Sequence, residues 1–467
     1  MKILLLKPIN QKYYIIQPSL GLGYLARIIK DLGNHVKILD SGKENLTWDK
    51  FINYIKEEQF DIIGIQMFAQ EFQSVKKHIG LIKEYSPESL ILLGGAHISS
   101  DPENTMKSLQ DANFGFIGES EISIEKFLQL SKLDYTNPEK LRVIPGLVWR
   151  QDNKININEK ESIQNLDEIK FPEWDLINPS EYPVAPQGIF TKKTPVAPII
   201  VSRGCPYQCT YCSVKTLTGN KMRYRSIGNV IEEILLLYNK YGVREIQILD
   251  DNFTSKKEYV LSFCDELMKL NLDIALALPN GVRLDSLDEE VLKKMEKAGF
   301  YSMGVGIESG SDRVLKVMKK NLSTKIVKEK IELIKKHTRI HLTGFFIIGY
   351  VTETEEEILE TIKFAKSLKI DKANFLILMP FPGTEIWEIY KKNNNSEINW
   401  ENFFFYRVVG GLSDIPSEKL RKLQKKAMME FYLRPRIILG LINEIKTFSQ
   451  FKVLLTRTLD VFISSKT

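Results

Sequence analysis

Cysteine is rare in this 467-residue sequence, with only four copies. None occurs before Cys205, and three of the four fall between residues 205 and 212. A disulfide-stabilised extracellular domain distributes its cysteines along the chain, so this placement excludes that class and indicates a reducing compartment. The fourth, Cys264, lies in a helical pattern, and we expect it to be a small buried residue.

Long hydrophobic runs are also missing. No stretch approaches the roughly 18 consecutive apolar residues of a transmembrane helix, and residues 342–352 form the longest candidate. The apolar patch at the amino terminus ends at Lys7 and Pro8, too early for a secretory signal peptide. We therefore expect a cytoplasmic protein that is not transmembrane.

Acidic residues are few in the last part of the chain. Residues 401–467 contain 12 Lys and Arg against 6 Asp and Glu, so this segment carries the whole net charge of +6. Such a tail can serve an anionic substrate, a membrane surface or nucleic acid, or form a solvated helical face. Residues 433–462 mix apolar and basic side chains, which fits a packed closing helix, an interfacial helix near lipid or a surface for an acidic leader peptide.

The first 130 residues alternate short apolar segments with amphipathic ones. The strand candidates are residues 3–7, 35–39, 61–67, 90–93 and 114–117. One helix candidate starts after Ser19 and stops at Gly33, and a second starts at Thr47. Repeated βα units predict a Rossmann-like, doubly wound parallel sheet, which binds ligands beyond the carboxyl ends of its strands. We assign residues 1–135 to this domain.

A second βα series begins after a proline-rich segment. Residues 136–194 contain six prolines and are expected to form a wrapping linker, with a small hairpin near residues 143–155. The later strand candidates are residues 198–202, 245–249, 273–278, 302–307, 341–348 and 373–378. Six repeats fit a partial (β/α)6 TIM-like barrel over residues 195–395, with its site at the carboxyl ends of the strands. Residues 396–467 are expected to be helical, and the fold class is α/β.

The three clustered cysteines carry the strongest chemical signal. Cys205, Cys209 and Cys212 follow the first barrel strand with CxxxCxxC spacing. Three thiolates can hold three irons of a cubane [4Fe–4S] cluster, which normally takes four cysteines, so one iron stays open for another ligand. A structural zinc site is the alternative, but zinc prefers four protein ligands and no His lies nearby to complete the set.

This motif, with Tyr211 before the third cysteine, resembles the signature of the radical S-adenosylmethionine (SAM) superfamily. The resemblance implies that the open iron chelates SAM and that an electron from the cluster cleaves it to a 5′-deoxyadenosyl radical. It also implies that Tyr211 lies against adenine, Arg283 pairs with the SAM carboxylate and Glu308 binds ribose hydroxyls. The full set that the resemblance assigns to SAM is Tyr211, Asp250, Asp251, Arg283, Glu308, Ser309 and Gly349.

Most of residues 1–190 resemble the cobalamin-binding domain that precedes the barrel in one large radical SAM subclass. The matching segments are residues 18–26, 61–68, 93–97, 116–121 and 144–148. The DxHxxG motif, which supplies a His ligand to cobalt in other cobalamin domains, is absent, so we expect base-off cobalamin with no His ligand. The residues expected to contact cobalamin are Ser19, Leu20, Gly21, Gln66, Phe68, Gln70, Gly94, Gly95, Gly118 and Glu119.

The two resemblances together imply C-methylation of an unactivated carbon through methylcobalamin. Three alternatives stay open: radical cyclisation, cyclopropanation or rearrangement of a peptide or small molecule without net methyl transfer; a methylthiotransferase; and a non-catalytic cobalamin or redox sensor. The expected partners are an electron donor such as flavodoxin or ferredoxin and an unknown small-molecule, lipid or peptide substrate. We expect no nucleic-acid partner, and the sequence assigns no general acid or base.

Overall fold

Five short apolar strands form the parallel part of the first sheet. They are β1 (Lys2–Lys7), β2 (His35–Asp40), β3 (Ile62–Gln66), β4 (Leu90–Gly94) and β5 (Phe114–Phe116). This computed structural model describes residues 1–10, 16–183, 191–394, 398–400, 403, 408–410 and 412–445. The sheet order places β1 between β2 and β3, so the direction of winding reverses there. In such sheets the reversal point marks the ligand crevice, at the carboxyl ends of the strands.

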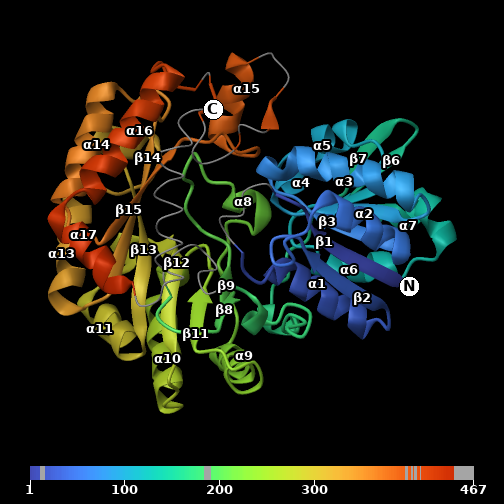
Figure 1. The fold of residues 1–467 in the computed structure, drawn as a ribbon, viewed down its shortest axis with the longest axis horizontal. Helices are drawn as coiled ribbons and strands as arrows, with labels where there is room; N and C mark the ends of the chain where they lie inside the picture. The colour runs from blue at the N-terminus through green and yellow to red at the C-terminus, as the bar shows by residue number, and fades with distance from the viewer. Residues whose placement is uncertain are drawn as a thin grey trace.

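Helices cover both faces of this sheet, as the doubly wound interpretation predicted (Figure 1). Thr47 caps the second helix through its side chain, whereas Ser19 precedes the first helix without capping it. The helices of this part are α1 (Leu20–Asp31), α2 (Trp48–Glu57), α3 (Phe72–Tyr85), α4 (Ala96–Ser100), α5 (Pro102–Ser108), α6 (Glu121–Leu128) and α7 (Pro138–Arg142).

The proline-rich segment contributes to both domains. Its hairpin, β6 (Leu147–Gln151) and β7 (Lys154–Ile157), extends the first sheet antiparallel to β5. Trp174 and Ile177 are instead buried with the apolar core of the second domain, together with Leu20 and Tyr24 of α1. The segment that we expected to be a wrapping linker therefore builds part of each core, while the domain boundaries themselves stay a prediction.

The second domain is a single parallel sheet of six strands, in agreement with the expected partial barrel. Each strand pairs with the one that precedes it along the chain. The strands are β8 (Val196–Ile199), β11 (Glu245–Ile248), β12 (Ala275–Val282), β13 (Phe300–Glu308), β14 (His341–Ile348) and β15 (Lys372–Ile377). The intervening helices are α9 (Ile227–Lys240), α10 (Lys257–Lys269), α11 (Glu289–Lys297), α12 (Asp312–Val317), α13 (Thr324–His337) and α14 (Glu355–Ser367).

A short two-stranded ribbon and a short helix flank the cysteines. Strand β9 (Ser202–Arg203) pairs antiparallel with β10 (Arg223–Tyr224), and α8 (Val214–Leu217) lies in the chain between them. Figure 1 shows α8 between the barrel and the first domain.

Two carboxyl-terminal helices, α16 (Ser417–Tyr432) and α17 (Pro435–Glu444), cover the edge of the barrel at β15. The helix before them, α15 (Glu385–Asn393), instead buries Ile386, Trp387 and Tyr390 with the core of the first domain. Gln424 of α16 donates to the Phe375 carbonyl of β15 (2.7 Å), and the Tyr432 hydroxyl bonds both backbone groups of Ala373 (2.9 and 3.2 Å). An uncovered edge strand invites pairing with another chain, and α16 prevents this.

The end of the chain lies partly outside the described residues. Helices α16 and α17 confirm the predicted helical region from Ser417 to Glu444, whereas the described residues 408–410 and 412–416 are not helical. Residues 446–467, the end of the basic tail, lie outside the described residues. Within the described part of the chain, no helix has both the length and the hydropathy needed to span a membrane.

Gln424→Met removes the side-chain donor to the edge strand while keeping the volume of the side chain. We expect the free energy of unfolding to fall by about 1–3 kcal/mol, because the buried Phe375 carbonyl loses its partner. The control Lys422→Met alters an exposed ion pair on the same helix and should stay within about 0.5 kcal/mol of the parent. Urea denaturation of both variants measures the difference, and equal values would contradict this role of Gln424.

Candidate active site

The three cysteines lie in a loop at the carboxyl end of β8. All three thiols are free and half-buried. Gly204 has a φ of +96°, and a Cβ there would lie 2.3 Å from the Lys221 carbonyl oxygen, so the turn before Cys205 requires glycine. Burial raises the pKa of Cys205, and it raises the pKa of Cys212 to about 11. In the absence of a bound cation the structure therefore favours protonated thiols at these two positions.

The described residues contain no group of three or more His, Cys, Asp or Glu side chains close enough to hold a single metal ion. In a cubane cluster each cysteine binds a different iron, so the donors lie farther apart than around one ion. The donor set of three thiols and no fourth ligand fits a cluster with one open corner.

Tyr211 belongs to a buried polar group beside the cysteines. Burial and the carboxylate of Glu308 raise the pKa of Tyr211 well above its usual value. Glu308 ends β13 with a φ of +68°, and its Oε1 accepts a hydrogen bond from Lys320 Nζ at 2.8 Å. A Cβ at Gly306 would lie 2.6 Å from that same carboxylate oxygen, so glycine makes room for the ion pair. The structure thus brings two predicted SAM residues, Tyr211 and Glu308, together.

Arg283 lies against the cysteine loop, and each of its three guanidinium nitrogens already donates a hydrogen bond. Its Nε and Nη2 donate to the two carboxylate oxygens of Asp285 (3.0 and 2.8 Å), and its Nη1 donates to the Lys320 carbonyl (2.9 Å). The guanidinium carbon lies 3.6 Å from the ring centroid of Tyr207, between the first two cysteines. The bidentate partner of Arg283 in this structure is Asp285, and its contact with the SAM carboxylate stays a prediction.

Asp250 and Asp251 follow β11 but differ in their surroundings. The buried carboxylate of Asp250 accepts hydrogen bonds from Val201 N (2.7 Å) and Ser202 Oγ (2.5 Å), which ties β11 to the start of the cysteine segment. Burial raises its pKa to about 7. Asp251 is exposed and accepts from Thr218 Oγ1 at 2.8 Å. Asp250 is therefore placed to fix backbone, whereas Asp251 faces the loop that follows the cysteines.

Asn252, the next residue, is buried with neither polar atom of its amide hydrogen-bonded. An unpaired buried amide costs free energy, so its presence at the carboxyl end of a barrel strand fits a site that a polar ligand completes.

Two other predicted SAM residues have structural partners. Ser309 is fully buried, and its hydroxyl bonds Thr361 Oγ1 (3.1 Å) and accepts from Ser311 N (3.1 Å). Gly349 has a φ of +74°, and its N–H donates to Glu353 Oε2 (2.7 Å). Their contacts with SAM stay predictions, but in this structure both residues fix the backbone of the barrel mouth.

The carboxyl edge of the first sheet presents a different surface. Ser19 Oγ donates to Gln66 Oε1 (3.0 Å), which joins the loops after β1 and β3 at the winding reversal. Phe68 is 43% exposed, a high value for a large aromatic residue. Gln70 is exposed as well, and a Cβ at Gly94 would meet no atom within 4 Å. An exposed ring and open space over glycine fit a flat macrocycle.

The neighbouring positions are more enclosed. Gly95 has a φ of +105°, and a Cβ there would lie 2.8 Å from the Met67 carbonyl, so the loops after β3 and β4 approach each other only with glycine. His97 is buried, both of its ring nitrogens lack partners, and burial lowers its pKa to about 4.

Four further residues in the predicted cobalamin set have other surroundings. Leu20 is buried in the core of the barrel domain, and Gly21 is exposed with open space around it. Glu119 accepts hydrogen bonds from both terminal nitrogens of Arg223, next to Gly118, which has a φ of +73°. Cobalamin contacts by these residues stay predictions.

The two edges meet through α8. Ser100 at the end of α4 bonds Thr216 of α8 (Oγ···Oγ1 3.2 Å), and Lys160 Nζ donates to the Thr216 carbonyl (2.7 Å). Helix α4 follows Gly94 and Gly95, and α8 follows Cys212. The loop that carries the cysteines therefore adjoins the carboxyl edge of the first sheet.

Comparison with known proteins agrees with this architecture. A radical SAM superfamily model matches residues 199–365, and a B12-binding domain model matches residues 6–128. An uncharacterised methyltransferase of Pyrococcus horikoshii is 33% identical over 452 residues, which cover 95% of each chain. The chain belongs to the cobalamin-dependent radical SAM enzymes.

Other members of this enzyme family are more distant. Cytidylyl-2-hydroxyethylphosphonate methyltransferase of Streptomyces wedmorensis is 29% identical, over 82% of this chain and 80% of the relative. The anaerobic magnesium-protoporphyrin IX monomethyl ester cyclase of Cereibacter sphaeroides is 25% identical, over 79% and 60%. The structure of the radical SAM methyltransferase TsrM from Kitasatospora setae, with tryptophan and a SAM analogue, superposes with a TM-score of 0.67 at 17% identity, over 84% and 76%. At that identity the likeness shows the fold.

Several residues of the site carried no clear signal in the sequence. Lys320 follows another Lys, and such a pair is typical of a solvated surface, yet Lys320 is 6% exposed. Asn252 lies in a segment that the sequence marks, but only the structure shows its unpaired amide. Arg203 lies two residues before the cysteine motif, and nothing in the sequence identifies its partner.

Lys320→Met leaves Glu308 as a buried carboxylate without its cation. We expect the free energy of unfolding to fall by about 3–5 kcal/mol, since loss of one partner exposes the full desolvation cost of the other. Lys319→Met is a matched control, because Lys319 pairs with Glu385 in the open, with side chains 50% and 43% exposed, and should cost about 0–1 kcal/mol. Equal denaturation midpoints for the two variants would contradict the importance of the buried pair.

Proposed function

We propose that this enzyme is a cobalamin-dependent radical SAM C-methyltransferase. The observation that carries the proposal is the contact between α8 and α4, which places the cysteine loop beside the carboxyl edge of the first sheet. Methylation through cobalamin requires that a radical formed at one cofactor and the methyl group on another reach the same substrate carbon. An enzyme that used only one of the two cofactors would not need this juxtaposition.

The barrel mouth supplies the residues for the cluster and SAM. Cys205, Cys209 and Cys212 would hold three irons, and the open iron would bind SAM. Tyr211 and Glu308, which lie together beside the cysteines, would receive the adenosine part. We add the unpaired amide of Asn252 to the predicted set, since a polar ligand at the end of β11 would satisfy it.

The first sheet supplies the surface for cobalamin. Phe68 and the open space over Gly94 would lie against the corrin, with Ser19 and Gln66 at the winding reversal. His97 is buried beside Phe72 and Trp400, so we keep the expectation that cobalt has no His ligand.

When bound, the cluster with SAM would supply a 5′-deoxyadenosyl radical and the cobalamin a transferable methyl group. The chain would orient both groups and exclude water. Tyr350, Trp387 and Trp400 are buried in one apolar cluster with core residues of the first domain, which would help keep water from the junction.

The substrate stays a small molecule, lipid or peptide. A flavodoxin or ferredoxin would deliver electrons, and the thiols and cluster suit the reducing cytoplasm. Because a cyclase is among the relatives, radical cyclisation without net methyl transfer is the second candidate.

Products of SAM turnover separate the candidate functions. The anaerobic, reconstituted chain is incubated with SAM, cobalamin and a low-potential reductant. A C-methyltransferase should release S-adenosylhomocysteine only when cobalamin is present, at most one equivalent per cobalamin because cobalamin is then the only methyl acceptor, and also 5′-deoxyadenosine and methionine from cleavage that is uncoupled from substrate. A cyclase should give 5′-deoxyadenosine without S-adenosylhomocysteine, a methylthiotransferase should give both without cobalamin, and a sensor should give neither. Any outcome but the first overturns the proposal.

Cys205→Ala should abolish the iron–sulfur absorbance and 5′-deoxyadenosine release, because it removes one of three iron ligands. Cobalamin binding, measured by absorbance, should persist because it depends on the other domain. Cys264→Ala is the matched control, since Cys264 is buried in α10, and this variant should keep both the cluster and the activity. Retention of the cluster in Cys205→Ala would contradict the assignment.

A further inference from the structure

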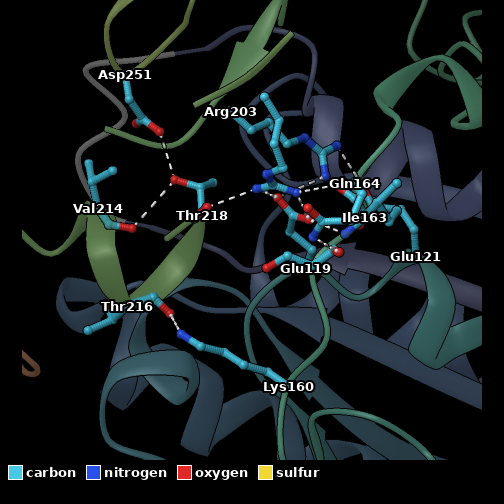
Figure 2. Close-up of polar contacts among 12 residues, drawn as sticks. Glu119, Glu121, Lys160, Ile163, Gln164, Arg203, Val214, Thr216, Thr218 and Asp251 are labelled. Atoms are coloured by element: carbon cyan, nitrogen blue, oxygen red, sulfur yellow. Dashed lines mark hydrogen bonds and ion pairs between the residues drawn. The ribbon is translucent and has the colours of Figure 1, made fainter. Parts of the chain in front are cut away.

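Four charged side chains are buried together where the two domains meet. Glu119 and Glu121 come from the first domain, and Arg203 and Arg223 come from the cysteine segment of the barrel domain. All four are at least nine-tenths buried, at 8%, 8%, 8% and 5% exposure. Figure 2 shows Arg203 beside Glu119 and Glu121 at the junction of the two domains.

Glu119 is the centre of this ion-pair cluster. Its Oε1 lies 2.6 Å from Arg223 Nη2 and 3.5 Å from Arg203 Nη1, and its Oε2 lies 2.8 Å from Arg223 Nη1. The Ile163 backbone N–H also donates to Oε2 at 3.1 Å. Glu121 Oε1 accepts from Arg203 Nη2 at 2.6 Å. Both oxygens of Glu119 thus already accept hydrogen bonds from within the chain, so we expect its carboxylate to act inside the protein and not on cobalamin.

The two arginines stand at the two ends of the segment that carries the cysteines. Arg203 lies two residues before Cys205. Arg223 is opposite Arg203 in the antiparallel β9–β10 ribbon. Arg223 Nη2 also donates to the Thr218 carbonyl (2.8 Å), while Thr218 Oγ1 donates to Asp251 (2.8 Å). Ion pairs with the first domain therefore hold both ends of residues 203–223, and α8, in the middle of this segment, makes further contacts with Ser100 and Lys160.

A buried ion pair is a weak means of adding stability but a strong means of fixing geometry. The cost of desolvating four charges offsets much of their attraction. Apolar side chains of similar volume would therefore give the folded chain about the same stability. A bidentate arginine–carboxylate pair accepts only a narrow range of positions and orientations. Burial opposes ionisation of Glu121, yet the adjoining Arg203 holds the pKa of this carboxyl below its usual range, so the charges persist.

We infer that Glu119 is a positioning residue, which holds the cysteine segment against the first domain through Arg223 and thereby sets the iron–sulfur site relative to the cobalamin surface. This inference rests on the proposed function for the identity of the two cofactors. It does not rest on it for the coupling between the domains, which is a property of the chain alone.

Hydrogen–deuterium exchange on the full chain without cofactors tests the coupling. Glu119→Gln keeps the shape of the side chain but removes the charge, and exchange in residues 203–223 should become at least about tenfold faster. The matched control is Glu233→Gln, which breaks the equally buried pair with Arg225 inside the barrel domain (side chains 0% and 5% exposed). This control should not accelerate exchange in residues 203–223 to the same extent.

A magnetic measurement separates positioning from stability. In the reconstituted chain the reduced cluster and cob(II)alamin are both paramagnetic, and their interaction broadens the electron paramagnetic resonance signals. Glu119→Gln should weaken this interaction while iron content and cobalamin affinity stay at the parent's values. The double variant Glu119→Gln/Arg223→Gln removes the uncompensated cation, so it should recover thermal stability but not the magnetic interaction.

Three results would overturn the inference. Exchange in residues 203–223 that is no faster in Glu119→Gln than in Glu233→Gln would show that the pair does not hold the segment. If the double variant kept the magnetic interaction of the parent, the ion-pair cluster would contribute to stability but not to the placement of the two cofactors. Weaker cobalamin binding by Glu119→Gln with unchanged exchange would return Glu119 to the cobalamin contacts. If the chain bound neither cofactor, the proposed function would fail, and the exchange measurement would still decide the coupling.

Discussion

The ion-pair cluster of Glu119, Glu121, Arg203 and Arg223 is the interaction on which the arrangement of the site depends. Two parallel sheets can each place a ligand surface at their carboxyl ends without reference to the other. Here the loop that holds the cysteines is part of the barrel domain in the sequence, but its side chains and backbone also bond to residues of the first domain and of the segment that follows it. The relative placement of the two surfaces is therefore built into the chain before any cofactor binds.

The site around the cysteines follows the same logic on a smaller scale. Arg283 stacks on Tyr207 of the cysteine loop and donates to the carbonyl of Lys320, whose ammonium pairs with Glu308 beside Tyr211. Several of the polar side chains that the sequence associates with SAM thus hold one another in place. Asn252 stands apart, since its amide has no partner and is available to a ligand.

The alternation of apolar and amphipathic segments was sufficient to predict both sheets, because buried parallel strands need continuous apolar residues and their crossovers need helices. It could not predict that β6 and β7 extend the first sheet or that Trp174 packs on the second core, since short segments between prolines carry little periodicity. The three cysteines were recognisable because their chemistry requires fixed spacing. The partners of Arg203, Arg223 and Lys320 were not, because a charged residue gives the same signal in sequence whether it is solvated or buried against an opposite charge that lies far along the chain.

Because the charges between the two domains are buried, the relative placement of the domains should respond weakly to salt. Mobile ions screen charges that face water over a distance of about 8 Å at physiological ionic strength, but they screen enclosed charges much less. Solvent-exposed ion pairs such as Lys107–Glu103 should weaken at high salt concentration. The attraction between Arg223 and Glu119 should weaken much less, because both side chains are buried. The spacing between the two domains should therefore depend little on the ionic strength of the surrounding solution.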